Sequence, residues 1–163
     1  VSDQFDFEGE FAVVIGKPGR YIAKENWKDY IAGYTIIMDG SIRDFQKRSV
    51  DQGKNFYHSS SSGPWLITMD EVPEDFRDMN LTTRLNGKVM QASDLGKLCF
   101  DVSDLISYYS QIFYFQPGDM ISTGTPGGVG SRRDPPIWMK PGDELEVEIT
   151  GVGILKNAVV GEN

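Results

Sequence analysis

The segment TTRLNGKVMQ constrains the fold most strongly, because it has the pattern of a tight β-hairpin. Asn86 and Gly87 are the pair that a two-residue type I′ turn prefers, since both central positions of that turn need a positive φ. The segment ELEVEITGVGILKNAVV repeats the strand–turn–strand pattern, with Leu145, Val147 and Ile149 alternating with glutamates. The chain is therefore expected to build its core mainly from strands.

Further strands and a few helices are expected around these segments. Short apolar runs predict strands over Phe11–Ile15, Tyr34–Met38 and Trp65–Met69. One strongly amphipathic helix is expected in VSDLISYYSQIFYF (102–115), with Ser103 as its N-cap. Shorter helices are expected over Lys24–Ala32, with Gly33 as C-terminal cap, and from Ser41 through Lys47. The pattern predicts one domain over residues 1–163 of the α+β class, predominantly β.

The composition of the chain argues against some classes of binding partner. A formal net charge of −8 argues against binding to nucleic acid or to anionic membranes. No apolar run approaches the roughly 20 residues that a membrane-spanning helix needs. The single cysteine, Cys99, excludes an internal disulfide and fits a reducing cytosol, and its apolar neighbours favour a buried side chain. We therefore expect a cytoplasmic protein with neither nucleic acid nor membrane as a partner.

Three acidic residues lie next to runs that the pattern expects to be buried. Glu8 and Glu10 are two residues apart at the start of FEGEFAVVIG, and Asp39 ends the run GYTIIMD. Residues i and i+2 of a strand point to the same face, so Glu8 and Glu10 are expected to project side by side. An acid beside a core is costly unless it is paired or binds a metal. With Asp39, the pair forms a candidate oxygen-only site for Mg²⁺, Mn²⁺ or Ca²⁺.

Two loops carry further candidates, each with a plain structural alternative. Lys54 in DQGKNFYHSSSSGPW is either a solvated surface charge or a cation that steadies an oxyanion beside a metal. His58, the only histidine, is interpreted as a surface residue in preference to a catalytic one. The run MISTGTPGGVGS, which contains Gly124 and Thr125, predicts a strand that leads into a glycine-rich loop. This loop is either a carboxylate-binding backbone or a simple connection.

Taken in order, these segments resemble the fumarylacetoacetate hydrolase family. The resemblance covers nearly all of the chain and rests on the ordered blocks FEGEFAVVIGK, AGYTIIMDGSIRDFQ, GKNFYHSSSSGPWLIT, RLNGKVMQ, PGDMISTGTPGGVG and MKPGDELEVEITGVGILKN. Each block is weak alone, whereas the ordered combination is highly specific. The resemblance implies a mixed β-roll or sandwich of the fumarylacetoacetase C-terminal-domain type, a Mg²⁺ or Mn²⁺ site and a homodimer.

The resemblance also implies roles for individual residues. The family's metal ligands match Glu8, Glu10 and Asp39. Its active-site lysine matches Lys54, which favours the site role of this residue over the surface role. The family's positions that face or bind the substrate match Arg43, Gln46, Gly124 and Thr125.

One part of the family pattern has no match in this chain. Many members have a histidine and a glutamate that activate water on a segment before the Glu-x-Glu pair. Here seven residues precede Glu8, and none of them is histidine. We expect from this that an N-terminal segment of a longer protein is missing.

The activity that the resemblance implies is Lewis-acid chemistry on a small 2-oxo or 2,4-dioxo acid. We expect hydrolysis of a C–C bond in an acylpyruvate-like substrate through a metal-stabilised enolate, with Lys54 beside the developing charge. Isomerisation and decarboxylation of related acids pass through a similar enolate and stay open as alternatives. From other classes, a catalytically silent metal-binding subunit and a small-molecule binding module also stay open.

Overall fold

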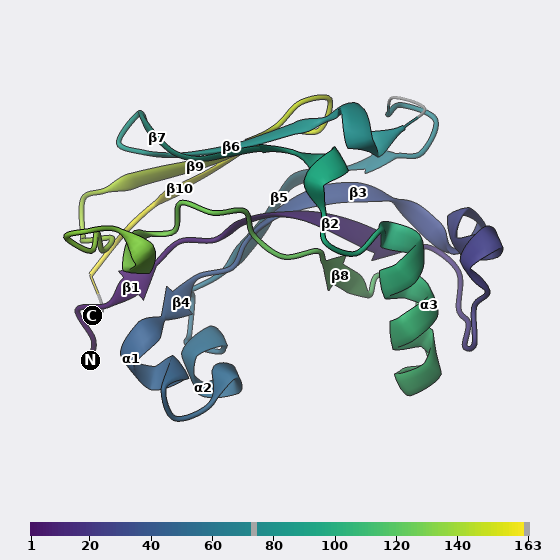
Figure 1. Cartoon of the computed structure of the whole chain (residues 1–163), viewed down its shortest axis with the longest axis horizontal. Coiled ribbons are helices and arrows are strands. Elements are labelled where there is room, and N and C mark those ends of the chain that lie inside the picture. Colours follow the sequence, from purple (N-terminus) through teal and green to yellow (C-terminus); the bar gives the residue numbers. More distant parts are fainter. Residues whose placement is uncertain (73–74, 162–163) are drawn as a thin grey trace.

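Two four-stranded antiparallel sheets, which pack face to face, form most of the molecule in the computed structural model (Figure 1). The structure describes residues 1–72 and 75–161. The first sheet has the strand order β10-β9-β6-β7 and the second has the order β5-β3-β2-β8. All strand pairs in these two ranges are antiparallel, whereas the resemblance implies a mixed roll. The predicted α+β class with a predominance of β-structure is confirmed.

The first sheet consists of the two hairpins that the sequence predicts. β6 (Asn80–Leu85) and β7 (Lys88–Asp94) are joined at Asn86 and Gly87, whose φ values of 52° and 77° suit a type I′ turn. β9 (Glu144–Ile149) and β10 (Gly153–Ala158) form the second hairpin. β9 also pairs with β6, which joins the two hairpins into one sheet.

The second sheet carries the strands next to the candidate acids. β2 (Gly9–Ile15) lies between β3 (Ile31–Met38) and β8 (Met120–Ser122), and β5 (Ser61–Thr68) pairs with the far side of β3. A separate short pairing joins β1 (Phe5–Asp6) to β4 (Ser41–Ile42). This pairing brings the chain just before Glu8 alongside the chain just after Asp39.

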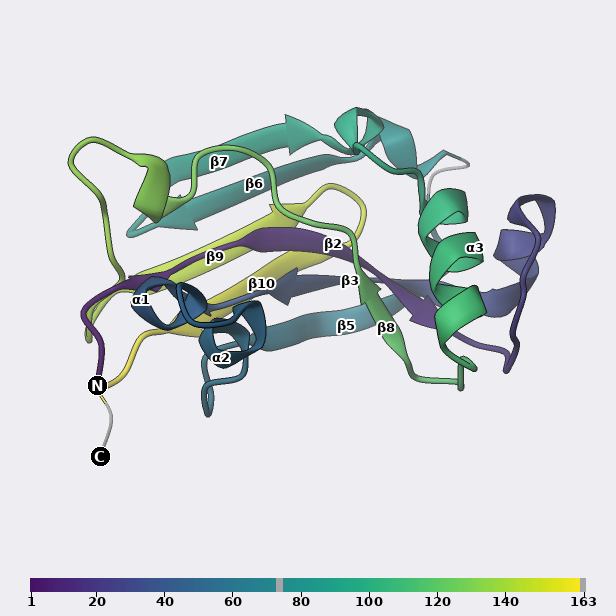
Figure 2. The same ribbon diagram turned by 60° about the horizontal axis from the view of Figure 1, so that its bottom comes forward.

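The α-helices lie around the second sheet. α1 (Arg43–Gln46) and α2 (Val50–Lys54) lie together beside β4 (Figure 1). α3 (Val102–Ile112) lies beside β8 (Figure 2). The described 3₁₀-helices are η1 (Lys24–Tyr30), η2 (Phe76–Asp78), η3 (Leu95–Lys97) and η4 (Gly130–Arg132). Among the residues that the structure describes, no helix has the length and apolar character needed to cross a membrane.

Gly33 does not cap a helix, contrary to the prediction. Ala32 and Gly33 lie inside β3, because the preceding helix ends at Tyr30. A Cβ at Gly33 would lie 1.9 Å from the carbonyl oxygen of Ile67 in β5. The glycine is needed here for the close approach of two strands, which local sequence cannot reveal.

Two predicted N-caps are also wrong. Asp101, rather than Ser103, caps α3, because the Asp101 side chain accepts a hydrogen bond from the Ser103 N–H. Ser41 lies in β4, and its hydroxyl donates to the Asp39 carbonyl oxygen at 3.1 Å instead of capping α1. In this second case the strand pairing with β1 outweighs the local preference for a helix start.

The core between the sheets fixes the strands that hold the acids. Phe11 of β2 and Tyr34 of β3 are 0% and 1% exposed, and their ring centroids lie 4.8 Å apart. Phe76 stacks on Phe11 at a centroid distance of 5.6 Å. Full burial of such a side chain contributes about 1.5–3 kcal/mol. The site therefore rests on a rigid pair of strands.

Candidate metal centre

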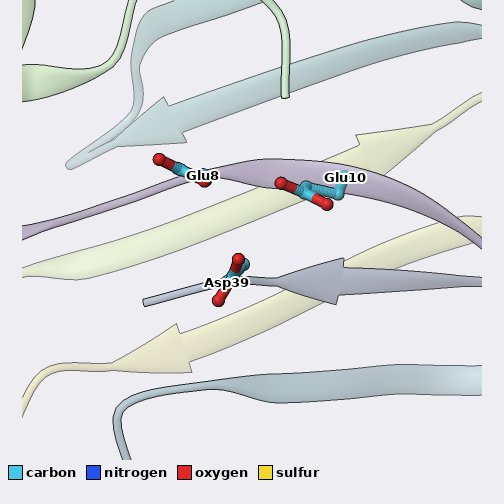
Figure 3. Close-up of side chains that lie close together, drawn as sticks. All are labelled: Glu8, Glu10 and Asp39. Carbon is cyan, nitrogen blue, oxygen red and sulfur yellow. The ribbon is translucent and has the colours of Figure 1, made fainter. Parts of the chain in front are cut away.

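The three predicted acids converge at one end of β2 and β3 (Figure 3). Glu8 immediately precedes β2, Glu10 lies within it, and Asp39 immediately follows β3. The Asp39 N–H donates to the Glu8 carbonyl oxygen at 2.9 Å and continues the pairing of these strands. One carboxylate oxygen from each residue lies within 4.8 Å of the others. The period-two spacing of the glutamates and the antiparallel pairing together produce this convergence.

Glu10 is the most enclosed of the three. The residue is 4% exposed, and its carboxylate accepts hydrogen bonds from the Ser122 hydroxyl and from the Gly124 N–H. Burial raises the pKa of Glu10, and the nearby charges of Asp39 and Glu8 also raise it, while the bonds from Ser122 and Gly124 act in the opposite direction. Keeping Glu10 ionised in this position therefore costs free energy, and a bound cation would offset that cost.

Lys54 enters the site from the end of α2. Its Nζ donates to Glu8 Oε2 at 2.6 Å and to Asp39 Oδ2 at 2.5 Å. Burial alone would lower the pKa of Lys54, but its hydrogen bonds to Asp39 and Glu8 outweigh this effect and raise it. The structure therefore places this lysine among the acids rather than on the solvated surface.

Arg43 and Gln46 lie on α1, and their polar groups bind other parts of the protein. Arg43 Nη1 donates to Gln46 Oε1 at 2.9 Å, and Nη2 forms an ion pair with Glu8 Oε1 at 2.6 Å. The third nitrogen, Nε, donates to Asp6 Oδ2 at 2.8 Å. Asp6 is fully buried and also accepts the Gly130 N–H at 2.7 Å. Arg43 therefore links Glu8 to a buried carboxylate that holds the end of the glycine-rich loop.

The glycine-rich loop contacts the strand that carries the glutamates. Thr125 Oγ1 donates to the Gly9 carbonyl oxygen at 2.9 Å, and the Gly124 N–H donates to Glu10 Oε2 at 3.1 Å. Gly124 has a φ of 93°, a conformation that glycine adopts readily. The loop also lines a pocket of about 480 Å³ together with Phe11 and the segment around Leu95. Of the candidate site residues, Gly124 and Thr125 line this pocket, whereas the three acids, Lys54 and Arg43 do not.

The charges around the acids fit a divalent cation. Asp6, Glu8, Glu10 and Asp39 are four carboxylates, and the ion pairs to them among the described residues come from Arg43 and Lys54. The cluster thus has two more carboxylates than cations. Carboxylate oxygens are the donors that Mg²⁺, Mn²⁺ and Ca²⁺ prefer. Glu8, Glu10 and Asp39 could therefore hold such an ion.

His58 and Cys99 lie outside this cluster. His58 is exposed, and its ring stacks on Tyr57 with the ring centroids 3.8 Å apart. Cys99 is exposed, so the prediction of a buried side chain is wrong. Cys99 follows η3 and lines the pocket beside the glycine-rich loop, because the chain leaves the core at this point.

Three polar residues of the site were missed in the sequence. Asp6 continues the period-two spacing of Glu8 and Glu10 in FDFEGE, so a local signal for it was present. Ser122 and Gln91 carry no such signal. Gln91 in particular reaches Gly9 across 82 residues of sequence, so only the tertiary structure identifies it.

Known proteins resemble this chain over almost its full length. A family model described as fumarylacetoacetate (FAA) hydrolase C-terminal matches residues 1–160. The chain is 41% identical over 162 residues to the oxaloacetate tautomerase Fahd2a, mitochondrial, of Rattus norvegicus. That match covers 98% of this chain and 51% of the relative. The chain thus spans about half the length of this curated relative.

Solved structures share the fold closely. A fumarylacetoacetate hydrolase from the psychrophilic Exiguobacterium antarcticum has a TM-score of 0.94 and 36% identity, over 99% of this chain and 58% of that chain. A maleylpyruvate hydrolase from Sphingobium sp. SYK-6, in complex with manganese (II) ion and pyruvate, has a TM-score of 0.85 and 32% identity. The second match covers 96% of this chain and 55% of that chain.

Proposed function

The chain belongs to the fumarylacetoacetate hydrolase family, and we propose that it is a divalent-metal-dependent enzyme that interconverts the keto and enol forms of a small 2-oxo acid such as oxaloacetate. The observation that carries this proposal is the convergence of Glu8, Glu10 and Asp39, together with the Lys54 ammonium group that donates to Glu8 and Asp39. The name of the rat relative, an oxaloacetate tautomerase, supports the choice of substrate. Mg²⁺ is the proposed ion, with Mn²⁺ as its closest substitute.

The proposed reaction moves one proton and two electron pairs. A proton leaves the carbon next to the 2-oxo group, and the electron pair of that C–H bond forms a C=C bond to the 2-oxo carbon. The π pair of the C=O bond moves onto the 2-oxo oxygen, and a proton then binds that oxygen. Glu8, Glu10 and Asp39 would hold a divalent cation, which would supply Lewis-acid stabilisation of the negative charge on the 2-oxo oxygen. Lys54 contributes a fixed positive charge, because two hydrogen bonds hold its Nζ in place. The chain thus provides a preorganised site for an enolate.

Substrate contacts are proposed for the residues around this centre. Thr125 and Gly124 would bind the carboxylate of the substrate, with the Thr125 hydroxyl turned away from the Gly9 carbonyl oxygen, and Gln46 would bind its distal end. Arg43 has all three guanidinium nitrogens directed at protein groups, so we propose that it acts mainly by holding Glu8. The single cysteine of the chain, Cys99, is consistent with the proposed reducing, cytoplasmic compartment.

Hydrolysis of a C–C bond in an acylpyruvate is the second candidate. It is favoured by the similarity to a maleylpyruvate hydrolase whose structure contains manganese and pyruvate. Both reactions develop negative charge on a 2-oxo oxygen, but hydrolysis also needs an activated water molecule. Decarboxylation of oxaloacetate, which needs only enolate stabilisation, and a catalytically silent metal-binding subunit are the remaining alternatives.

The two candidate reactions differ in their products, so one set of assays separates them. With Mg²⁺ present, we expect the chain to accelerate the loss of enol ultraviolet absorbance when enol oxaloacetate is added to buffer. Pyruvate release from a panel of acylpyruvates measures hydrolysis, and pyruvate from oxaloacetate measures decarboxylation. Enol conversion abolished by a chelator and restored by Mg²⁺ is the expected result. Pyruvate release without enol conversion would favour hydrolysis or decarboxylation, and no turnover of any kind would favour the silent subunit.

We also propose that the chain forms a homodimer. α3 buries Val102, Ile106 and Ser110, while Tyr108, Ile112, Phe113 and Tyr114 at its outer face and end are at least half exposed. Large exposed aromatic side chains are typical of interfaces. Sedimentation at micromolar concentration should give twice the monomer mass of 18.2 kDa. A monomer under these conditions would contradict the proposal, and Phe113→Asp should convert a dimer into a monomer.

A further inference from the structure

Gln91 of β7 is a buried amide that bonds in two directions. The residue is 1% exposed. Its Oε1 accepts the Gly9 N–H at 3.0 Å, and its Nε2 donates to Thr125 Oγ1 at 2.8 Å and to the Pro126 carbonyl oxygen at 2.9 Å. The amide oxygen of Gln91 thus accepts one hydrogen bond, and its NH₂ group donates two. An apolar or anionic side chain could not make the same set.

The groups that Gln91 joins are the two halves of the candidate site. Gly9 lies between Glu8 and Glu10 in the sequence, so the bond to its N–H fixes the position of the backbone from which both carboxylates project. Thr125 follows Gly124, whose N–H bonds to Glu10. The Thr125 hydroxyl closes the arrangement by donating to the Gly9 carbonyl oxygen at 2.9 Å. Gln91 therefore connects the strand of metal ligands to the loop proposed to bind the substrate carboxylate.

The same part of β7 also supports the loop further along. A Cβ at Gly128 would lie 2.3 Å from the Met90 carbonyl oxygen, which shows how closely the loop approaches β7. Arg133 Nη2 donates to that same oxygen at 2.6 Å, and Arg133 Nε donates to the Gly128 carbonyl oxygen at 3.1 Å. Gln91 is almost fully buried, so a lost bond here would leave a buried polar group unsatisfied.

We propose that Gln91 is a positioning residue that holds the Glu8–Glu10 strand and the Gly124–Thr125 loop in the geometry needed to bind metal and carboxylate together. The inference rests on the proposed function, since it assigns Gln91 a role in that site. Gln91 does not touch the substrate; it acts through Gly9 and Thr125.

Gln91→Met tests the role, because it keeps a long unbranched side chain and removes every hydrogen bond of the amide. The matched control is Thr83→Val. Thr83 pairs with Gln91 in the neighbouring strand, is fully buried and packs against Gly9, yet its hydroxyl has no hydrogen-bond partner among the described residues. Both variants change a buried polar side chain next to Gly9, but only Gln91→Met removes hydrogen bonds to the loop. Gln91→Asn, whose amide is too short to reach both sides, replaces the methionine variant if that one does not fold.

Amide hydrogen exchange, measured without any ligand, is the first readout. In Gln91→Met, exchange at Gly9 and at the amides of residues 123–125, 127 and 128 should accelerate about tenfold. This is the loss of protection that one broken hydrogen bond of average strength produces. Exchange in the β9–β10 hairpin should not change, and Thr83→Val should match the unaltered chain. Unchanged loop exchange, or an equal acceleration throughout both sheets, would overturn the proposal.

Binding of oxalate, a planar dicarboxylate, in the presence of saturating Mn²⁺ is the second readout. Gln91→Met and Thr125→Val should each weaken oxalate binding about tenfold. The double variant should lose far less oxalate affinity than the product of the two single effects, since both residues act through one contact. Independent, multiplying effects would overturn the role of Gln91 in positioning Thr125. Failure of the unaltered chain to bind oxalate would instead count against the proposed function, and hydrogen exchange would still decide the role of Gln91.

Discussion

Glu10→Gln is expected to weaken metal binding strongly and, at the same time, to stabilise the metal-free protein. Glu10 contributes one of three converging carboxylates, and loss of an outer-shell partner alone already lowers metal affinity roughly 10–100-fold. We therefore expect Mg²⁺ and Mn²⁺ to bind at least about 100-fold more weakly to this variant. The free energy of unfolding without metal should rise, because a neutral amide replaces a buried charge that lies beside Glu8 and Asp39.

Titration calorimetry and thermal unfolding with and without Mn²⁺ measure both effects. A ligand present at 100 times its dissociation constant stabilises a protein by about 2.7 kcal/mol, so the unaltered chain should unfold at a clearly higher temperature with Mn²⁺. Glu148→Gln is the control, since it removes the same charge from an ion pair with Arg84 in the other sheet. Equal Mn²⁺ affinity in Glu10→Gln and the unaltered chain would show that the three acids are not the metal site.

Lys54→Met is expected to separate catalysis from metal binding. The ammonium group lies between Glu8 and Asp39, so its removal takes away a positive charge that repels a bound cation. Metal affinity should stay the same or increase. Turnover should fall by about 10²–10³-fold, the usual loss when one donor that stabilises a developing oxyanion is removed. Steady-state kinetics at saturating Mg²⁺, combined with Mn²⁺ titration, checks both expectations.

Lys156 offers a matched control for Lys54. Its Nζ also joins two carboxylates, Glu144 at 2.6 Å and Glu146 at 3.3 Å, but on the exposed face of the β9–β10 hairpin. Lys156→Met should leave both turnover and metal affinity unchanged. If Lys54→Met lowers metal affinity and turnover by the same factor, the lysine supports the acids and does not act on the substrate.

Local rules of the chain were enough to predict a large part of the fold. The Asn86–Gly87 turn and the alternation in ELEVEI depend on neighbouring residues only, and both hairpins form as predicted. The prediction that Glu8 and Glu10 project together has the same basis, because side-chain direction alternates along any strand. Predictions from local preference were wrong where tertiary contacts competed with it. Gly33 lies against the neighbouring strand β5, and Ser41 of β4 pairs with β1.

The sequence by itself determined that strands dominate, and it placed three acids, a lysine and a glycine-rich loop in the order of a known family. Only the tertiary structure decided how these parts meet. Lys54 lies between Glu8 and Asp39, Arg43 is fixed by the buried Asp6, and Gln91 joins the metal strand to the loop. Such contacts join residues far apart in the sequence, as the bond between Gly9 and Gln91 does across 82 positions, and no local pattern encodes such a distance.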